Sequence, residues 1–239
     1  MTNEEDVDRE AKDHDDALLK EMLDRKPSPF TELFTATPDG PNAQLNPSLI
    51  SQSGHLDDYF RVAREIAEGL PDDVPAIEMR LFPLLLNYRH AVELALKYAL
   101  VNLVRRIRTD DATYQYQIPT HHKLGPLLDE VLRLHALAHP MLEKSTGAVD
   151  PPSTQAQGFI RELDVLDPSG MAFRYVHDKP KGTNPPARLI GKVTDIGVEA
   201  LIAGMTHIEK ELLWYISMIE NSTDLWEQWT ADMMADLGW

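Results

Sequence analysis

The residues best suited to chemistry in this chain lie in one apolar stretch, residues 84–104. Within it His90, Glu93 and Lys97 are spaced i, i+3 and i+7, and Arg89 lies four residues before Glu93. On an α-helix these spacings place the side chains along one stripe. Because the neighbouring residues are apolar, we expect these polar groups to be buried or at a helix seam, where each needs a charged or hydrogen-bonding partner.

Two later segments contain residues that could partner this stripe. The first is Thr-His-His-Lys-Leu at residues 120–124, which starts a new helical pattern and contains His122. The second spans residues 167–178 and contains Arg174, Tyr175 and His177 close together. Both segments must pack against residues 84–104 if the three pieces form one site.

These three pieces occur in a characteristic order. A Tyr-Arg-His-Ala-x-Glu-Leu-x-Leu-Lys helix is followed by a His-x-Leu-x-x-Leu helix start and a Leu-Asp-x-Ser-x-x-x-Phe-Arg-Tyr segment. The combination, over about residues 80–215, resembles HEPN-domain helical proteins. The resemblance implies an up-and-down helical bundle that commonly dimerises. It also implies either a metal-independent ribonuclease of the toxin–antitoxin or phage-defence type, or a non-catalytic member.

The sequence departs from the catalytic motif of that family, Arg-x(4–6)-His. Its two matches, Arg9/His14 and Arg133/His139, are as many as chance gives, and only two residues separate Arg174 from His177. If the protein cleaves RNA, we expect a histidine to act as general acid or base and an arginine to stabilise the phosphorane-like charge.

We therefore predict a site that binds or cleaves RNA or binds a nucleotide-like anion. The candidate catalytic residues are Arg174, His177 and His90. The candidate substrate-binding residues, or members of a structural polar network, are Arg89, Glu93, Lys97, His122 and Tyr175. The alternative hypothesis is a non-catalytic helical interaction or scaffold module, in which the same polar stripe fixes helix register.

No metal or cofactor is expected. His135 and His139 have the i, i+4 spacing of a helical metal site, but no third ligand pattern accompanies them. There is no cysteine, which excludes disulfides, Cys-ligated zinc and thiol catalysis. Glycine-rich phosphate loops and the Gly-x-Ser-x-Gly motif are also missing from the sequence.

Composition and charge restrict the function further. The 239 residues are 43% hydrophobic and 26% charged, as in ordinary globular proteins. The net charge of −16 is uneven: residues 1–78 hold 19 acids and 7 bases, residues 79–126 hold 3 and 7, and residues 127–239 hold 17 and 9. A non-specific nucleic-acid binder is therefore not expected, although a local basic cleft could hold a phosphate chain. The acidic N-terminus lacks an apolar run, so we expect a cytoplasmic protein without a membrane partner.

Periodicity of 3.6 residues dominates the chain and predicts an all-α bundle over residues 55–239. Residues 1–54 are expected to form a partly extended, acidic arm that contains a proline-rich linker and a short amphipathic helix, which could bind a protein partner. One short β-hairpin is expected from residues 171–176 and 188–193. Three of the four tryptophans lie near the C-terminus, which favours docking on another surface and most simply a homodimer. The expected helices cover residues 56–70, 75–104, 124–138, 154–166, 196–219 and 225–237.

Overall fold

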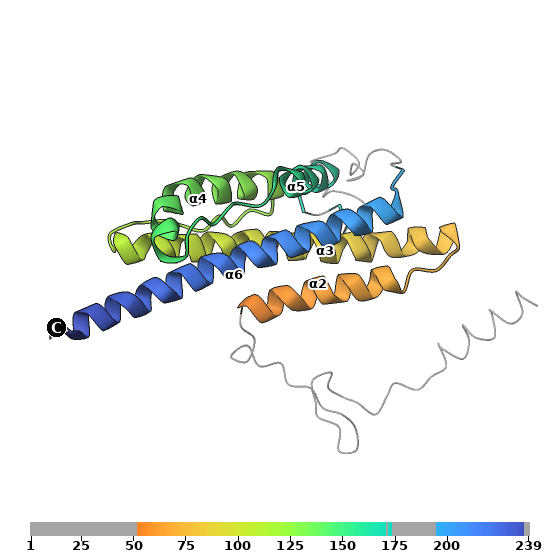
Figure 1. The fold of residues 1–239 in the computed structure, drawn as a ribbon. Helices are drawn as coiled ribbons and strands as arrows, with labels where there is room; N and C mark the ends of the chain where they lie inside the picture. Colours follow the sequence, from red (N-terminus) through yellow and green to blue (C-terminus); the bar gives the residue numbers. More distant parts are fainter. Residues whose placement is uncertain (1–51, 171, 174–194, 237–239) are drawn as a thin grey trace, which may run out of the picture. The chain divides into compact units, whose positions relative to one another are not determined.

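The computed structural model describes residues 52–170, 172–173 and 195–236 (Figure 1). The chain divides into two units, Met1–Pro47 and Ser48–Trp239, and all the described residues belong to the second. The expected arm helix, linker and β-hairpin strands fall outside the described residues, apart from a turn at Ala172 and Phe173. The helices are α2 (Gln52–Glu68), α3 (Val74–Asp110), α4 (Leu124–Thr146), α5 (Thr154–Leu166) and α6 (Val198–Asp236).

The all-α helical bundle is confirmed. Helix α3 is its central element and packs against α2, α4 and α6. Helices α2 and α3 are antiparallel neighbours, since Tyr59 meets His90 near one end of the pair and Gly69 meets Arg80 near the other. The side chains that fill the core are mostly leucine, alanine and valine of α3 and α4, with Phe60 of α2 and Tyr215 of α6. In the described part of the chain, no helix combines the length and apolar character needed to cross a bilayer.

Helices α3, α4 and α6 run in the same direction. Tyr98 and Arg105 of α3 bond to Glu220 and Glu227 of α6, so both pairs share one sequence offset, 122 residues. Arg106 of α3 likewise reaches the carbonyl of Met141 in the second half of α4. Parallel helices need a return segment, and residues 111–123 supply the one between α3 and α4. This connection is what brings His122 back to the middle of α3.

The start of α3 follows from its local sequence. Asp73 caps the helix, and its Oδ2 accepts the backbone N–H of Ala76 at 3.1 Å. Pro75 lies in the first turn, where a missing N–H costs nothing. The helix continues through Pro83, an exposed position, and ends at Asp110.

Three expected helix ends were wrong. Helix α3 runs to Asp110 instead of ending at residue 104. Helix α4 passes through Pro140 to Thr146, because Pro140 and the carbonyl of Ala136 that it leaves unbonded both lie on an exposed face that water reaches. The two separate C-terminal helices are one helix, α6. Its polar middle does not interrupt it, since Thr223 Oγ1 donates to the Ile219 carbonyl at 2.8 Å and Ser222 Oγ donates to the Leu142 carbonyl of α4 at 3.5 Å.

Candidate functional site

The candidate site is centred on the buried carboxylate of Glu93, in the middle of α3. Its Oε1 atom lies 2.8 Å from Lys97 Nζ on the next turn and 2.8 Å from His122 Nδ1, just before α4. The Glu93 side chain is 2% exposed, whereas that of His122 is 53% exposed and that of Lys97 is 23% exposed. A buried anion thus holds two cationic or ionisable groups at the surface.

The protonation state of the pair follows from its surroundings. Burial raises the pKa of Glu93, but the hydrogen bonds from Lys97 and His122 outweigh it and leave the pKa below its usual value. Glu93 is therefore a carboxylate at neutral pH and can only accept hydrogen bonds. Since His122 Nδ1 must then carry the proton, the neutral ring has its free lone pair on Nε2.

Arg89 lies beside this pair, but each nitrogen of its guanidinium is already engaged within the protein. Its Nε and Nη2 atoms donate to the Asp167 carbonyl at 3.3 and 3.2 Å, and Nη2 also donates to the His122 carbonyl at 2.6 Å. Nη1 donates to Glu93 Oε2 at 3.4 Å, and Nε pairs with Asp167 Oδ2 at 3.2 Å. With a side chain 3% exposed, Arg89 holds the return segment and the turn at Asp167 onto α3.

The turn after α5 closes over Arg89. Asp167 Oδ1 accepts the backbone N–H of Ala172 at 3.1 Å and the hydroxyl of Ser169 at 3.2 Å. Gly170 has a φ of +73°, and a Cβ atom there would lie 2.9 Å from Arg89 Nη1 and 3.0 Å from His122 Cβ. Only glycine fits this position without strain or displacement of a neighbour.

Sequence reasoning did not assign a role to Asp167 or Gly170. The signal was present in the Leu-Asp-x-Ser-Gly order, which is typical of a turn that follows a helix. What the sequence could not give is the target of the turn, because Arg89 lies 78 residues away.

His90 has a different environment from Glu93. Its ring packs edge-on against Tyr59 of α2, with the ring centroids 4.4 Å apart and an interplanar angle of 82°. It is half-buried between α2 and α3, whereas His122 approaches α3 from the side of the return segment. Of the two histidines, His122 is the more exposed.

Comparison of the chain with protein-family models, with curated proteins and with solved structures found no match.

The remaining candidate residues are not brought into this site by the described structure. Arg174, Tyr175 and His177 lie outside the described residues, as do Arg9 and His14. Arg133 is engaged by Glu130 one turn earlier on α4, with N–O distances of 2.8 and 2.7 Å.

The two histidines with metal-ligand spacing are used by the core. His135 Nδ1 lies 3.0 Å from the Tyr215 hydroxyl, and its ring is 5.7 Å from that of His139. Burial, and then the neighbouring His139, lower the pKa of His135. Within residues 52–170, 172–173 and 195–236, no group of three or more His, Asp or Glu side chains is arranged to hold a metal.

The basic middle of the sequence is largely neutralised by other parts of the fold. Arg105 pairs with Asp224 at 2.8 Å and with Glu227, and these contacts raise its pKa. Arg106 is fully buried between Asp110 of α3, the Met141 carbonyl and the Trp226 ring, whose centroid is 4.9 Å away. Arg108 has no acidic partner in the part of the chain that the structure describes and donates its Nε to the Tyr114 carbonyl at 3.1 Å.

In chemical terms, the site combines an oriented and exposed imidazole with a nearby ammonium. The imidazole Nε2 can accept a proton from a substrate hydroxyl. Lys97 can attract an anion to the same place, since its ammonium group contacts the same oxygen of Glu93 as His122 does. The arrangement is suited to proton transfer on an anionic substrate.

Proposed function

We propose that this protein is a HEPN-like RNA-binding protein that cleaves RNA without a metal, with His122 as the general base. The observation that supports this function is the Glu93–His122 pair, in which a buried carboxylate fixes the tautomer of an exposed imidazole. Serine proteases use the same division of labour between a carboxylate and a histidine. Glu93 is a positioning residue in this proposal.

The reaction that fits these groups is transfer within the RNA backbone. His122 Nε2 removes the proton of a ribose 2′-hydroxyl, and the 2′ oxygen attacks the adjacent phosphorus. The bond from phosphorus to the 5′ oxygen breaks, and that oxygen takes up a proton. The products carry a 2′,3′-cyclic phosphate and a 5′-hydroxyl. Lys97 lies close enough to the imidazole to attract the phosphate, because both side chains contact Glu93 Oε1.

Arg174 and His177 complete the proposal from the sequence. Arg174 stabilises the negative charge that develops on the phosphoryl oxygens, and His177 donates the proton to the leaving oxygen. They follow Phe173, a buried residue, and Gly170, which packs against His122. His90 is assigned no step, since its ring packs against Tyr59.

The test is a cleavage assay on single-stranded RNA in the presence of a chelator. We expect the wild type to release products with a 2′,3′-cyclic phosphate. His122→Ala should lower kcat by about 10²-fold or more, in the range of lost general base catalysis. His121→Ala is the matched control, because His121 is the exposed neighbour of His122 and, among the described residues, its hydrogen-bond partner is the Lys123 backbone N–H. Glu93→Gln should retain some activity and change the pH profile of kcat.

Two results would overturn the proposal. One is a folded wild type that leaves RNA intact under these conditions. The other is His122→Ala protein that cleaves at the rate of the wild type. If the double variant Arg174→Ala/His177→Ala folds and keeps full activity, the roles given to these two residues are wrong.

A second candidate function, a helical interaction module that forms a homodimer, is favoured by a different observation. The last third of α6 exposes Leu225, Trp229 and Met233 at i, i+4 and i+8, with exposed fractions of 51%, 53% and 40%. Large apolar side chains in one exposed stripe commonly mark protein interfaces. Sedimentation velocity tests this function: a wild-type dimer that Trp229→Ser converts to a monomer supports it, and a monomeric wild type at high concentration contradicts it.

A further inference from the structure

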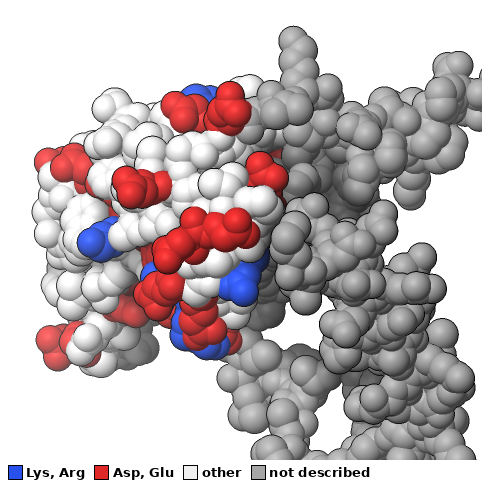
Figure 2. Space-filling view, turned by 90° about the vertical axis from the view of Figure 1, so that its right-hand side faces the viewer, with Lys and Arg blue, Asp and Glu red and all other residues white. Residues whose placement is uncertain are grey.

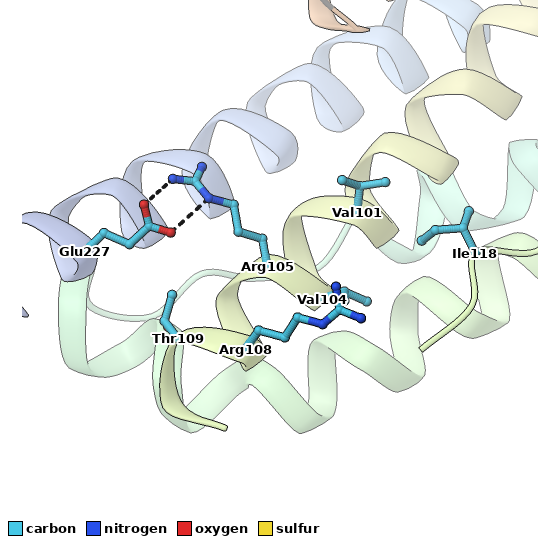
Figure 3. A pocket seen from close by; sticks show the side chains of 7 residues that line it. All are labelled: Val101, Val104, Arg105, Arg108, Thr109, Ile118 and Glu227. Atoms are coloured by element: carbon cyan, nitrogen blue, oxygen red, sulfur yellow. Dashed lines mark hydrogen bonds and ion pairs between the residues drawn. The ribbon is translucent and has the colours of Figure 1, made fainter. Parts of the chain in front are cut away.

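A pocket of about 380 Å³ lies next to the candidate site, toward the C-terminal end of α3 (Figure 3). Val101 and Val104 of α3 and Ile118 of the return segment form its apolar part. The two chain segments that meet at the pocket also meet at Glu93 and His122. The pocket therefore begins one helical turn beyond Lys97, on the same face of α3.

The return segment follows α3 in the opposite direction over this whole distance. Its Tyr114 carbonyl accepts from Arg108, Ile118 shares the pocket with Val101, and His122 reaches Glu93. These three contacts connect the pocket and the candidate site without an intervening element. A single strand of several nucleotides can thus touch both.

Two arginines border the pocket, and they differ in availability. Arg105 points to α6, where it pairs with Glu227 and Asp224 (Figure 3). This pairing also neutralises Glu227, the acidic residue that lines the pocket. Arg108 uses only Nε, for the Tyr114 carbonyl, and no described residue takes up its terminal amino groups. The pocket thus offers an apolar wall and one exposed guanidinium with donors to spare, a combination that suits a base with a neighbouring phosphate.

We propose that this pocket is a distal subsite for single-stranded RNA. The apolar wall takes a nucleobase, and Arg108 binds a phosphate of the same strand. The inference rests on the proposed function, because it extends the RNA strand away from His122. A volume of about 380 Å³ is at the low end of small-molecule sites and suits one nucleoside.

The geometry gives the length of strand that reaches Arg108. Lys97 and Arg108 are eleven residues apart on α3, or about 16 Å along the helix axis. At about 3.4 Å per stacked nucleotide, this distance corresponds to about five nucleotides. A dinucleotide that occupies the His122 site therefore does not reach Arg108.

The opposite end of the bundle does not suit a phosphate chain. Figure 2 views the molecule from the end at which α3 and α6 begin, and the charged side chains on the described surface there are mostly acidic. Asp72, Asp73 and Glu78 lie at the start of α3, and Asp195 and Glu199 lie at the start of α6. The strand is thus expected to run from His122 toward Arg108 and away from this acidic end.

The experiment compares Arg108→Gln with Arg133→Gln. Both variants remove one positive charge from an exposed arginine, so they change the net charge of the protein equally. The substrates are a dinucleoside monophosphate and a single-stranded decanucleotide, with kcat and KM measured separately. For the decanucleotide, Arg108→Gln should raise KM about tenfold and leave kcat unchanged. For the dinucleotide, both variants should match the wild type.

Salt dependence supplies an independent readout. Binding of the decanucleotide to His122→Ala protein should weaken with salt, and adding Arg108→Gln should reduce the slope of log K against log salt by about 0.7, the value for one phosphate contact on a single strand. Val101→Phe fills the pocket and keeps every charge. In the otherwise wild-type protein it should raise KM for the decanucleotide, and in the His122→Ala protein it should leave this slope unchanged.

The outcomes separate this inference from the function on which it rests. If the wild type cleaves RNA through His122 but Arg108→Gln behaves like Arg133→Gln, the subsite is wrong and the proposed function stands. An equal rise in KM of Arg108→Gln for the dinucleotide and the decanucleotide also overturns the subsite. If the wild type neither binds nor cleaves either substrate, the proposed function fails first.

Discussion

Arg89 and Arg108 are arginines of the same helix, but the fold buries the first and exposes the second. All three nitrogens of the Arg89 guanidinium find acceptors within the protein, and a glycine turn covers it. Arg108 is exposed and has one contact, to a backbone carbonyl. The difference shows that a basic residue is structural or available for a ligand according to how many acceptors the chain itself supplies.

The largest expected effect is the loss of the Arg89 guanidinium. Arg89→Met keeps most of the side-chain volume but leaves the buried carboxylate of Asp167 without its cation, which should cost about 3–5 kcal/mol of unfolding free energy. Arg108→Met should change it by less than about 0.5 kcal/mol, as for other exposed positions. Urea unfolding of the two variants measures this difference. Equal stabilities would contradict the division between the two arginines.

A smaller loss is expected from Gly170→Ala. The left-handed backbone conformation costs a non-glycine residue about 1–2 kcal/mol, and the added methyl group also displaces Arg89 or His122. Gly158→Ala is the matched control, since Gly158 lies inside α5 with open space around it. That control should gain up to about 1 kcal/mol. Thermal unfolding of both variants tests the two signs together, and a Gly170→Ala protein as stable as the wild type would show that Arg89 is not tightly covered.

Arg106 sharpens the comparison, because it is buried like Arg89 but covered by an aromatic ring. Trp226→Ala removes the ring that lies 4.9 Å from its guanidinium and should cost about 1–2 kcal/mol. Trp229→Ala removes the more exposed partner of the same tryptophan pair and should change stability by less than about 0.5 kcal/mol. Chemical unfolding of both variants measures the two losses of unfolding free energy. A larger loss for Trp229→Ala than for Trp226→Ala would refute this ranking.

The smallest expected effect is a pH dependence at Glu93. The pKa of Glu93 is lower in the folded protein than its ordinary value of 4.5, so ionisation of this group stabilises the fold above that pH. This stabilisation is lost as the pH falls through the lowered pKa. The difference in unfolding free energy between the wild type and Glu93→Gln should therefore narrow below pH 4.5. If the difference in unfolding free energy stays constant down to pH 3, ionisation of Glu93 does not stabilise the fold.

The sequence predicted the members of the polar network better than their partners. The spacing of Arg89, Glu93 and Lys97 gives their shared stripe, because a helix fixes that geometry locally. Placing His90 on the same stripe did not anticipate its contact with Tyr59, which depends on the helix before α3. The contacts of Asp167 and Gly170 with Arg89 also depend on tertiary packing, and no pattern within one segment contains them.

Helix existence was likewise easier to predict than helix ends. Apolar periodicity predicted both ends of α5 to the residue and the start of α3 to within one residue, whereas α2 begins four residues earlier and α3 ends six residues later than expected. The capping residue of α5 is Ser153, whose Oγ accepts from Ala156 N. The expected ends at residues 138 and 219 come just before Pro140 and the polar residues 221–224. These residues do not break the helices, because Pro140 faces water and the Ser222 hydroxyl pairs with a hydroxyl of α4.

The parallel course of α3, α4 and α6 has an electrostatic consequence. In antiparallel bundles the helix dipoles cancel, but here the dipoles of α3 and α6 add, so positive ends gather where both helices begin. The acidic residues seen in Figure 2 lie at that end. Asp164 serves α4 in the same way, with its Oδ1 accepting Leu124 N–H at 2.7 Å, while Arg108 and Lys144 lie in the last turns of α3 and α4. Charged side chains at the starts of α3 and α6 and in the last turns of α3 and α4 therefore oppose the dipoles of this parallel arrangement.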